Sequence, residues 1–92
     1  MIEFDPMKND ENLAKHQLPL HFAELVFDEP FVEEEDDRHD YGETRFVATG
    51  PIALFGDRIF VVVYTWRDGL RRVISFRKAN DRETRKYRAS LS

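Results

Sequence analysis

Two arginines, a histidine and a tyrosine are the side chains of this sequence best suited to chemistry on an anionic ligand. Cleaving RNA without a metal needs a base for the 2′-hydroxyl, cations for the crowded phosphorane and an acid for the leaving 5′-oxygen. Arg45 and Arg77 suit the phosphorane because a planar guanidinium holds two phosphate oxygens at once. His16 suits proton transfer because the unperturbed pKa of histidine is near 6.5. Tyr87 could present its hydroxyl or stack a base.

Each of these residues also has a structural interpretation. Arg45 and Glu43 could pin the start of a strand, and His16 could interact with the free carbonyls at a helix end. Tyr87 could pack the last helix on a sheet, with Glu83 one helical turn before it. The residues by themselves indicate only a face able to bind an anion.

The sequence gives no indication of a metal or cofactor site. His16, His21 and His39 are far apart and form no ligand spacing of the HExxH kind. The acidic run 33–37 lacks the glycine and alternating oxygens of an EF-hand loop, and the four glycines read as turn residues. We therefore expect no metal and no cofactor, so any RNA cleavage would be metal-independent.

The net charge of −4 conceals two oppositely charged segments. Residues 28–43 hold nine acidic side chains and one basic one, whereas residues 67–92 hold nine basic and three acidic ones. Phosphate binding requires clustered Lys and Arg. The last third of the chain could therefore bind RNA although the chain as a whole is acidic.

The composition indicates one small domain covering residues 1–92. A hydrophobic fraction of 41% with 13% aromatic residues is sufficient for one packed core. The chain has no cysteine, which favours a reducing compartment. Its first residues do not resemble a signal peptide, and no apolar run approaches the roughly 20 residues that cross a bilayer. We expect a cytoplasmic protein with no membrane partner.

Capping and spacing signals predict three helices. Asp5 and Pro6 begin a helix that runs to about His16. Pro19 begins a second, which ends before Pro30 and has a core face of Leu20, Ala23, Val26 and Phe27. Asp81 caps a final helix over residues 82–89.

Apolar runs and turn residues predict the strands. After a short N-terminal strand and a short edge strand at residues 31–33, three strands cover residues 44–49, 58–66 and 70–77. The second of the three is apolar on both faces and hence central, and residues 67–69 form a hairpin turn. The predicted fold is α+β, with two N-terminal helices packed on an antiparallel sheet and a C-terminal helix.

Strand alternation predicts which side chains share a face of the sheet. In the last strand Leu70, Arg72, Ile74 and Phe76 would face the helices, and the opposite side would carry Arg71, Val73, Ser75 and Arg77. If Phe46 points to the core, Arg45 lies on the same side as Arg77. Alternation buries Arg72, which favours a salt bridge at the edge of the core for this residue.

Several motifs, in order and at matching separations, are similar to BrnT toxins over nearly the whole chain. The strongest are residues 37–46, DRHDYGETRF, and residues 73–79, VISFRKA, which lead to Glu83 and Tyr87. Weaker matches are Phe4, Asp5, Pro6, Lys8, Asn12, Lys15, His16, Ala23, Val26 and Phe27. Two positions depart from the family pattern. Gln17 replaces a glycine that would end the first helix in a left-handed cap, so a different turn is expected, and Phe76 replaces a small residue.

The resemblance implies a fold like that of RelE toxins and an RNA-cleaving activity that arrests translation. It also implies a BrnA antitoxin, which silences the toxin and contacts DNA through its own ribbon-helix-helix domain. A non-catalytic or degenerate binding module of the same fold, engaging only an antitoxin or nucleic acid, is the alternative. Under the enzyme hypothesis we expect catalysis from Arg77, Arg45, His16, Glu83 and Tyr87, and RNA binding by Lys15, Arg71, Lys78 and Arg82.

Overall fold

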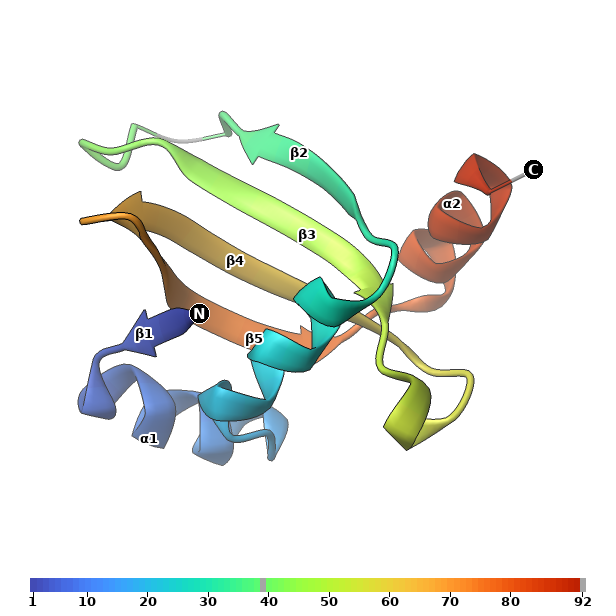
Figure 1. Ribbon diagram of the computed structural model, residues 1–92, viewed down its shortest axis with the longest axis horizontal. Helices are drawn as coiled ribbons and strands as arrows, with labels where there is room; N and C mark the ends of the chain where they lie inside the picture. Colours follow the sequence, from blue (N-terminus) through green and yellow to red (C-terminus); the bar gives the residue numbers. More distant parts are fainter. Residues whose placement is uncertain (39, 92) are drawn as a thin grey trace.

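Five strands form one sheet in the part of the chain that the computed structural model describes, residues 1–38 and 40–91. Across the sheet their order is β1 (Ile2–Phe4), β5 (Leu70–Lys78), β4 (Ile59–Arg67), β3 (Arg45–Pro51) and β2 (Val32–Asp36) (Figure 1). The predicted central strand is confirmed, since β4 lies in the middle and its Val61 and Val62 are buried. The α+β class is likewise confirmed, whereas the likeness to RelE toxins stays a prediction.

The sheet is mixed, which corrects the antiparallel sheet predicted from the sequence. The β2–β3, β3–β4 and β4–β5 pairs are antiparallel, but β1 runs parallel to β5, with Phe4 opposite Val73. A strand of three residues carries too little pattern to indicate a partner that lies at the other end of the chain. The β4–β5 turn is as predicted, because Asp68 and Gly69 both have positive φ, as a two-residue hairpin turn requires.

A β-bulge between β4 and β5 changes which face several side chains occupy. Val63 pairs with Ser75 and Tyr64 with Val73, so Ile74 is the additional residue. Val73 therefore joins the buried core. Alternation placed Val73 and Arg71 beside Arg77, and this prediction is wrong because an extra residue reverses the alternation on one side of a bulge.

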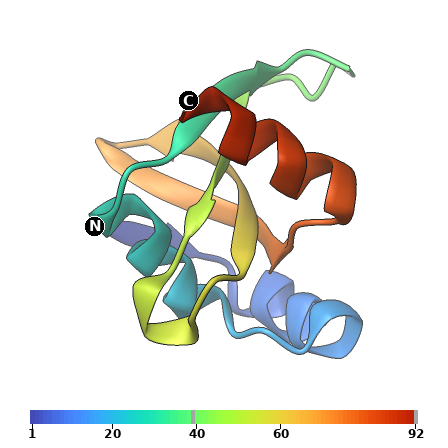
Figure 2. The ribbon, with the colours of Figure 1, turned by 90° about the vertical axis from the view of Figure 1, so that its right-hand side faces the viewer.

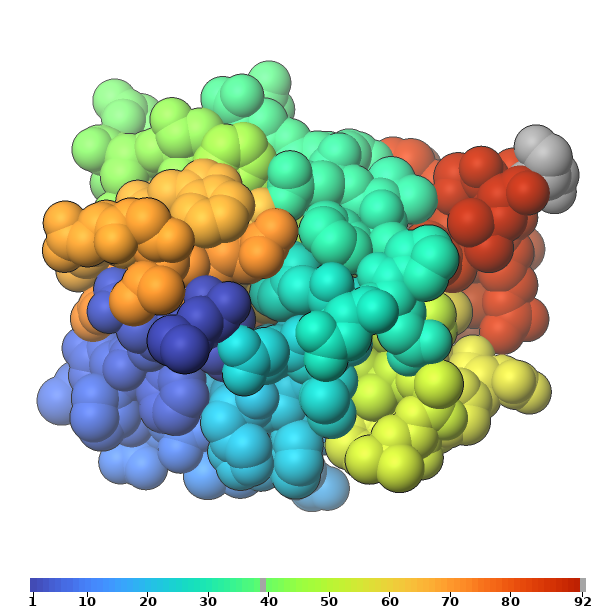
Figure 3. Space-filling view, in the orientation of Figure 1, coloured from blue at the N-terminus to red at the C-terminus, as the bar shows by residue number. Residues whose placement is uncertain are grey.

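Helical segments lie on both faces of the sheet (Figure 2), and each face carries its own apolar cluster. On one face η1 (Leu20–Asp28), a 3-10 helix, buries Leu20, Ala23 and Val26 completely, as its predicted core face requires. Figure 3 shows this segment covering the middle of that face. On the opposite face, here called the α2 face, Tyr87 of α2 (Asp81–Ser90) packs with Ile59 and Val61.

The helix α1 (Pro6–His16) is joined to β5 through a single buried side chain, Asn12. Since β1 pairs with β5 only as far as Val73, the backbone of Phe76 has no strand partner on that edge. Asn12 replaces the missing strand. Its Oδ1 accepts from the Phe76 N–H at 3.0 Å, and its Nδ2 donates to the Phe76 carbonyl at 2.6 Å and to the Leu18 carbonyl at 2.9 Å. This connection fixes the end of α1 relative to the residue after Phe76, which is Arg77.

Two helix ends differ from the sequence prediction. Gln17 adopts the left-handed conformation itself, with φ 61° and ψ 27°, and its N–H donates to the Leu13 carbonyl at 2.9 Å. The different turn expected there is therefore not formed. The cap of α2 is Asn80 and not Asp81, because Asn80 and Glu83 form a reciprocal capping box.

A short 3-10 helix, η2 (Ala53–Phe55), joins β3 to β4.

Among the described residues, no helix combines the length and the apolar character needed to span a membrane.

Candidate active site

A hollow of about 310 Å³, here called the first hollow, opens on the α2 face. Its apolar part is formed by four valines, Val32, Val47, Val61 and Val63. Charged side chains surround them, namely Glu34, Glu35, Asp36, Asp37, Arg38, Arg77, Glu83 and Lys86. Tyr87 also lines the hollow, so the structure brings together three of the five predicted catalytic residues: Arg77, Glu83 and Tyr87.

Arg77 and Glu83 form a two-pronged ion pair that ties β5 to α2. Nη1 and Nη2 of Arg77 donate to Oε1 and Oε2 of Glu83, each at 2.8 Å. Glu83 also accepts from the Asn80 N–H at 2.9 Å. The hydrogen bonds from Arg77 chiefly lower the pKa of Glu83 to about 2, while the bonded carboxylate raises the pKa of Arg77. At neutral pH Glu83 is therefore ionised and orients the guanidinium of Arg77.

Tyr87 is held in a structural contact. Its hydroxyl donates to the Pro30 carbonyl at 2.8 Å, and only 5% of the residue is exposed. Burial raises the pKa of the Tyr87 hydroxyl above its usual value, and the charge of Glu29 adds to this effect. The side chain forms part of the wall of the hollow.

His16 ends α1 and is not among the residues that line the first hollow. Desolvation by burial lowers the pKa of His16 below 6.5, and the positive charges of Lys15 and Arg77 lower it further. The charge of Arg77 thus acts on His16 although His16 does not line the hollow. At neutral pH the imidazole is unprotonated and able to accept a proton.

Arg45 lies on the α2 face, as predicted, because Phe46 packs against the other face. It nevertheless lines a different hollow, of about 180 Å³, here called the second hollow. The residues around this hollow are Asp5, Lys8, Glu43, Arg45, Thr65, Arg67, Arg72, Val73 and Ile74. Arg72 pairs with Glu3 at 3.4 Å, which confirms its predicted salt bridge but not its burial.

The four predicted RNA-binding residues do not form one surface. Lys15, Lys78 and Arg82 are exposed, at the ends of α1 and β5 and at the start of α2. Arg71 lies on the η1 side, where its guanidinium carbon is 4.1 Å from the centre of the Phe27 ring. Its prediction as a neighbour of Arg77 is wrong because of the bulge in β5.

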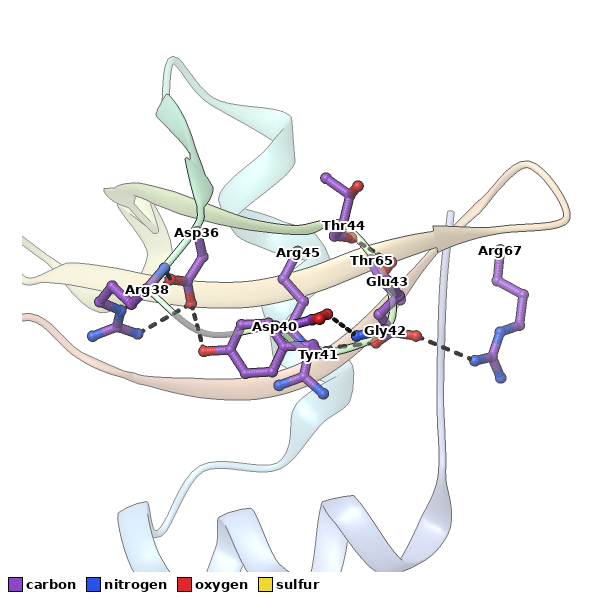
Figure 4. A network of polar contacts seen from close by, with 10 residues as sticks. All are labelled: Asp36, Arg38, Asp40, Tyr41, Gly42, Glu43, Thr44, Arg45, Thr65 and Arg67. Carbon is purple, nitrogen blue, oxygen red and sulfur yellow. Dashed lines mark hydrogen bonds and ion pairs between the residues drawn. The ribbon is translucent and has the colours of Figure 1, made fainter.

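Sequence reasoning missed Arg38, Asp36 and Lys86 as residues of the first hollow. Asp36, whose side chain is 2% exposed, accepts from Nε and Nη2 of Arg38 at 2.9 and 3.1 Å and from the Tyr41 hydroxyl at 3.2 Å (Figure 4). The hydrogen bonds from Arg38 chiefly lower the pKa of Asp36 to about 2. Lys86 pairs with Glu34 at 2.8 Å. For Arg38 the DRHDYGETRF motif was the available signal, whereas Asp36 and Lys86 lie outside that motif. His39 of the motif lies outside the described residues.

Among the described residues, no three His, Cys, Asp or Glu side chains gather in a way that could hold a metal ion.

Comparison with known proteins identifies the family. The family model for the ribonuclease toxin BrnT of type II toxin–antitoxin systems matches residues 4–83. The chain belongs to the BrnT family. The matched region contains Arg77 and Glu83 but ends before Tyr87.

Among solved structures, the chain resembles the 1.1 Å crystal structure of the Brucella abortus ribonuclease toxin BrnT. The TM-score is 0.62 at 23% sequence identity, over 87% of this chain and 96% of the Brucella chain. This likeness shows a common fold. Comparison with curated proteins gave no match. Membership in a family of type II toxins implies an antitoxin partner for this BrnT-family chain.

Proposed function

We propose that this chain is a metal-independent endoribonuclease that cleaves RNA at the first hollow and thereby arrests translation. The observation that carries the proposal is the Arg77–Glu83 pair, in which two 2.8 Å bonds orient a guanidinium at a hollow of a ribonuclease-family fold. A fixed cation at the reacting phosphate is the main requirement for stabilising a phosphorane.

In the proposed reaction the base is His16, which does not line the first hollow but lies near enough to Arg77 for the charge of Arg77 to lower its pKa. Because that pKa is lowered, His16 is unprotonated at neutral pH and can accept the proton of the RNA 2′-hydroxyl. The 2′-oxygen attacks phosphorus, and Arg77 stabilises the negative charge of the phosphorane. The 5′-oxygen leaves with a proton from water, which yields a 2′,3′-cyclic phosphate and a 5′-hydroxyl. Glu83 positions Arg77, and Tyr87 maintains the wall of the hollow.

We further propose that the antitoxin is of the BrnA type and that DNA is contacted only through its ribbon-helix-helix domain. The overall charge of −4 supports this division because the chain alone is a poor ligand for duplex DNA. Translation arrest would place the toxin in the cytoplasm.

A non-catalytic binding module is the second candidate function, and one observation favours it. Every cation that lines the first hollow already has a carboxylate partner within the described residues: Arg38 with Asp36, Arg77 with Glu83, and Lys86 with Glu34. A phosphate must therefore compete with these carboxylates before it is bound.

Cleavage by the purified chain separates the two functions. We expect single-stranded RNA to be cut equally well with and without EDTA, and Arg77→Ala to slow cleavage about a hundredfold to a thousandfold. Arg58→Ala serves as the control because Arg58 is exposed and lines neither hollow. The melting temperature of Arg77→Ala should stay close to that of the parent, since an ion pair whose side chains are 34% and 31% exposed contributes about 1 kcal/mol. A folded parent that leaves RNA intact would support the binding module.

A further inference from the structure

The geometry points to a phosphate-binding subsite for the RNA strand in the second hollow, and this inference rests on the proposed function. Four cations line the hollow, Lys8, Arg45, Arg67 and Arg72, against two carboxylates among its described lining residues, Asp5 and Glu43. The first hollow has the opposite balance, with five carboxylates and three cations. The positive charge of the α2 face is therefore concentrated at the second hollow, away from the first hollow where RNA cleavage is proposed.

The ion pairs of the second hollow are long. Glu43 is shared, because its Oε2 is 3.3 Å from Nε of Arg45 and its Oε1 is 3.8 Å from Nη2 of Arg67. Arg72 is 3.4 Å from Glu3, and Lys8 is 3.7 Å from Glu11. The Arg77–Glu83 pair, at 2.8 Å, is much closer. One carboxylate shared by two guanidiniums leaves N–H donors for phosphate oxygens, which arginine binds in a forked geometry.

The remaining acid of the second hollow is already occupied. Oδ1 of Asp5 accepts from the Met7 N–H at 2.8 Å as the N-cap of α1, so this carboxylate is committed to the helix. Asp5 keeps its charge, so the described lining of the second hollow has four cations against two carboxylates, an excess of two.

Two of the side chains are held in place before a ligand arrives. The guanidinium carbon of Arg45 lies 3.9 Å from the centre of the Tyr41 ring, and Figure 4 shows Arg45 and Arg67 converging on Glu43 from different strands. The Thr65 hydroxyl donates to the Thr44 carbonyl at 2.7 Å and so fixes the start of β3. Pre-ordered arginines lose little side-chain entropy on binding.

The position of the second hollow suits an RNA strand that also passes through the first hollow. Arg72 and Arg77 both belong to β5 and both lie on the α2 face, roughly 16 Å apart for five residues of extended chain. A single-stranded RNA whose scissile phosphate lay at Arg77 could place a phosphate further along the strand, beyond the adjacent one, among Arg45, Arg67 and Arg72. The described lining offers cations to a phosphate, and it lacks the aromatic anchor that is common in protein-binding hot spots.

RNA binding without cleavage tests the subsite. The probe is a short single-stranded 2′-O-methyl RNA, which has no free 2′-hydroxyl to attack phosphorus. Its binding is measured by fluorescence anisotropy over a series of salt concentrations. We expect the Lys8→Ala/Arg67→Ala double variant to bind this RNA at least about tenfold more weakly than the parent, because each substitution removes a charged contact with phosphate. The slope of log K against log salt should fall by about 0.7 per lost phosphate contact. Arg58→Ala should bind like the parent. Lys8 and Arg67 have side chains about half exposed, so both substitutions are expected to leave the chain folded.

A second variant changes the result in the opposite direction. Glu43→Gln removes the shared carboxylate, so we expect severalfold tighter RNA binding, which a damaged fold would not produce. Unchanged RNA affinity in both variants, or no binding by the parent, overturns the subsite. Loss of antitoxin binding in the double variant with unchanged RNA affinity does the same, in favour of a protein contact. The proposed function fails separately, if the parent binds RNA through these residues but does not cleave unmodified RNA.

Discussion

At the scale of single residues, the role of each arginine depends on the groups that its guanidinium contacts. The guanidinium of Arg77 contacts the carboxylate of Glu83. The guanidinium carbon of Arg71 instead lies 4.7 Å from the centre of the Trp66 ring and 4.1 Å from that of Phe27. Nε of Arg71 is buried with no hydrogen-bond partner. Aromatic faces attract the cation but satisfy none of its N–H donors. Two arginines of one strand therefore differ in environment although the sequence presents them alike.

The pKa of His16 gives a residue-scale prediction. Burial, with Lys15 and Arg77 adding repulsion, lowers this pKa below 6.5. A histidine titration followed by NMR should therefore give a midpoint below 6.5 for His16, and Arg77→Gln should move it upward by removing one positive charge. The unfolded chain binds this proton more readily than the folded one. The free energy of unfolding should therefore begin to decrease through His16 as the pH falls below 6.5. This decrease should be complete once the pH is below the pKa of His16 in the folded chain. A midpoint at or above 6.5 would contradict this environment.

At the scale of elements, the sequence predicted the helices and strands well and their relations less well. Capping and apolar runs placed the start of α1 at Pro6 and made β4 central, because those signals are local. The bulge at Ile74 has no local signal, so Arg71 was assigned to the wrong face. Arg77 and Glu83 were each expected as catalytic residues from the family resemblance, but nothing in the sequence indicated the contact between them. Arg38 and Lys86 were missed because the first hollow joins segments that are about 50 residues apart.

Asn12 gives an element-scale prediction, because its amide serves as the missing strand partner of β5. Asn12→Ala removes three hydrogen bonds and leaves the Phe76 N–H and carbonyl buried without partners. We expect a loss of about 2–4 kcal/mol in the free energy of unfolding, at roughly 1 kcal/mol per bond plus the unsatisfied groups. Urea unfolding followed by the fluorescence of Trp66 measures it. Glu11→Ala, at an exposed site of the same helix, should change stability by no more than about 0.5 kcal/mol. Equal effects of the two substitutions would contradict the role of Asn12.

The left-handed Gln17 gives a second element-scale prediction. A residue with a Cβ is strained at φ 61° by about 1–2 kcal/mol, and glycine avoids that strain but gains freedom in the unfolded chain. The net expectation for Gln17→Gly is an increase of about 0.5–1 kcal/mol in the free energy of unfolding. Gln17→Val, with a β-branched side chain, should destabilise the protein. Both are measured by urea unfolding, and a destabilised glycine variant would show that the Gln17 side chain makes a compensating contact.

At the scale of the whole molecule, the α2 face combines two regions of opposite charge balance. The first hollow contains the oriented Arg77, and the second hollow contains the excess of cations. Under the proposed function, this arrangement would let an acidic chain recruit RNA locally, while the acidic residues of β2 and the loop after it would disfavour non-specific binding. The same acidic segment borders the first hollow, so a partner that neutralised it would also cover the proposed site.

Toxicity in a bacterial host is the prediction for the whole molecule. If the chain cleaves RNA needed for translation, its expression alone should stop growth, and co-expression of an antitoxin encoded by the adjacent gene should restore growth. Arg77→Ala is the matched control. It should accumulate as a folded protein and permit growth, since it loses the cation proposed to stabilise the phosphorane but only about 1 kcal/mol or less of stability. It should also still bind the antitoxin if that contact does not use Arg77. Colony counts, soluble protein levels and incorporation of labelled methionine measure these outcomes. Normal growth with abundant soluble parent would favour the binding module, and a toxic, folded Arg77→Ala variant would move the active site away from the first hollow.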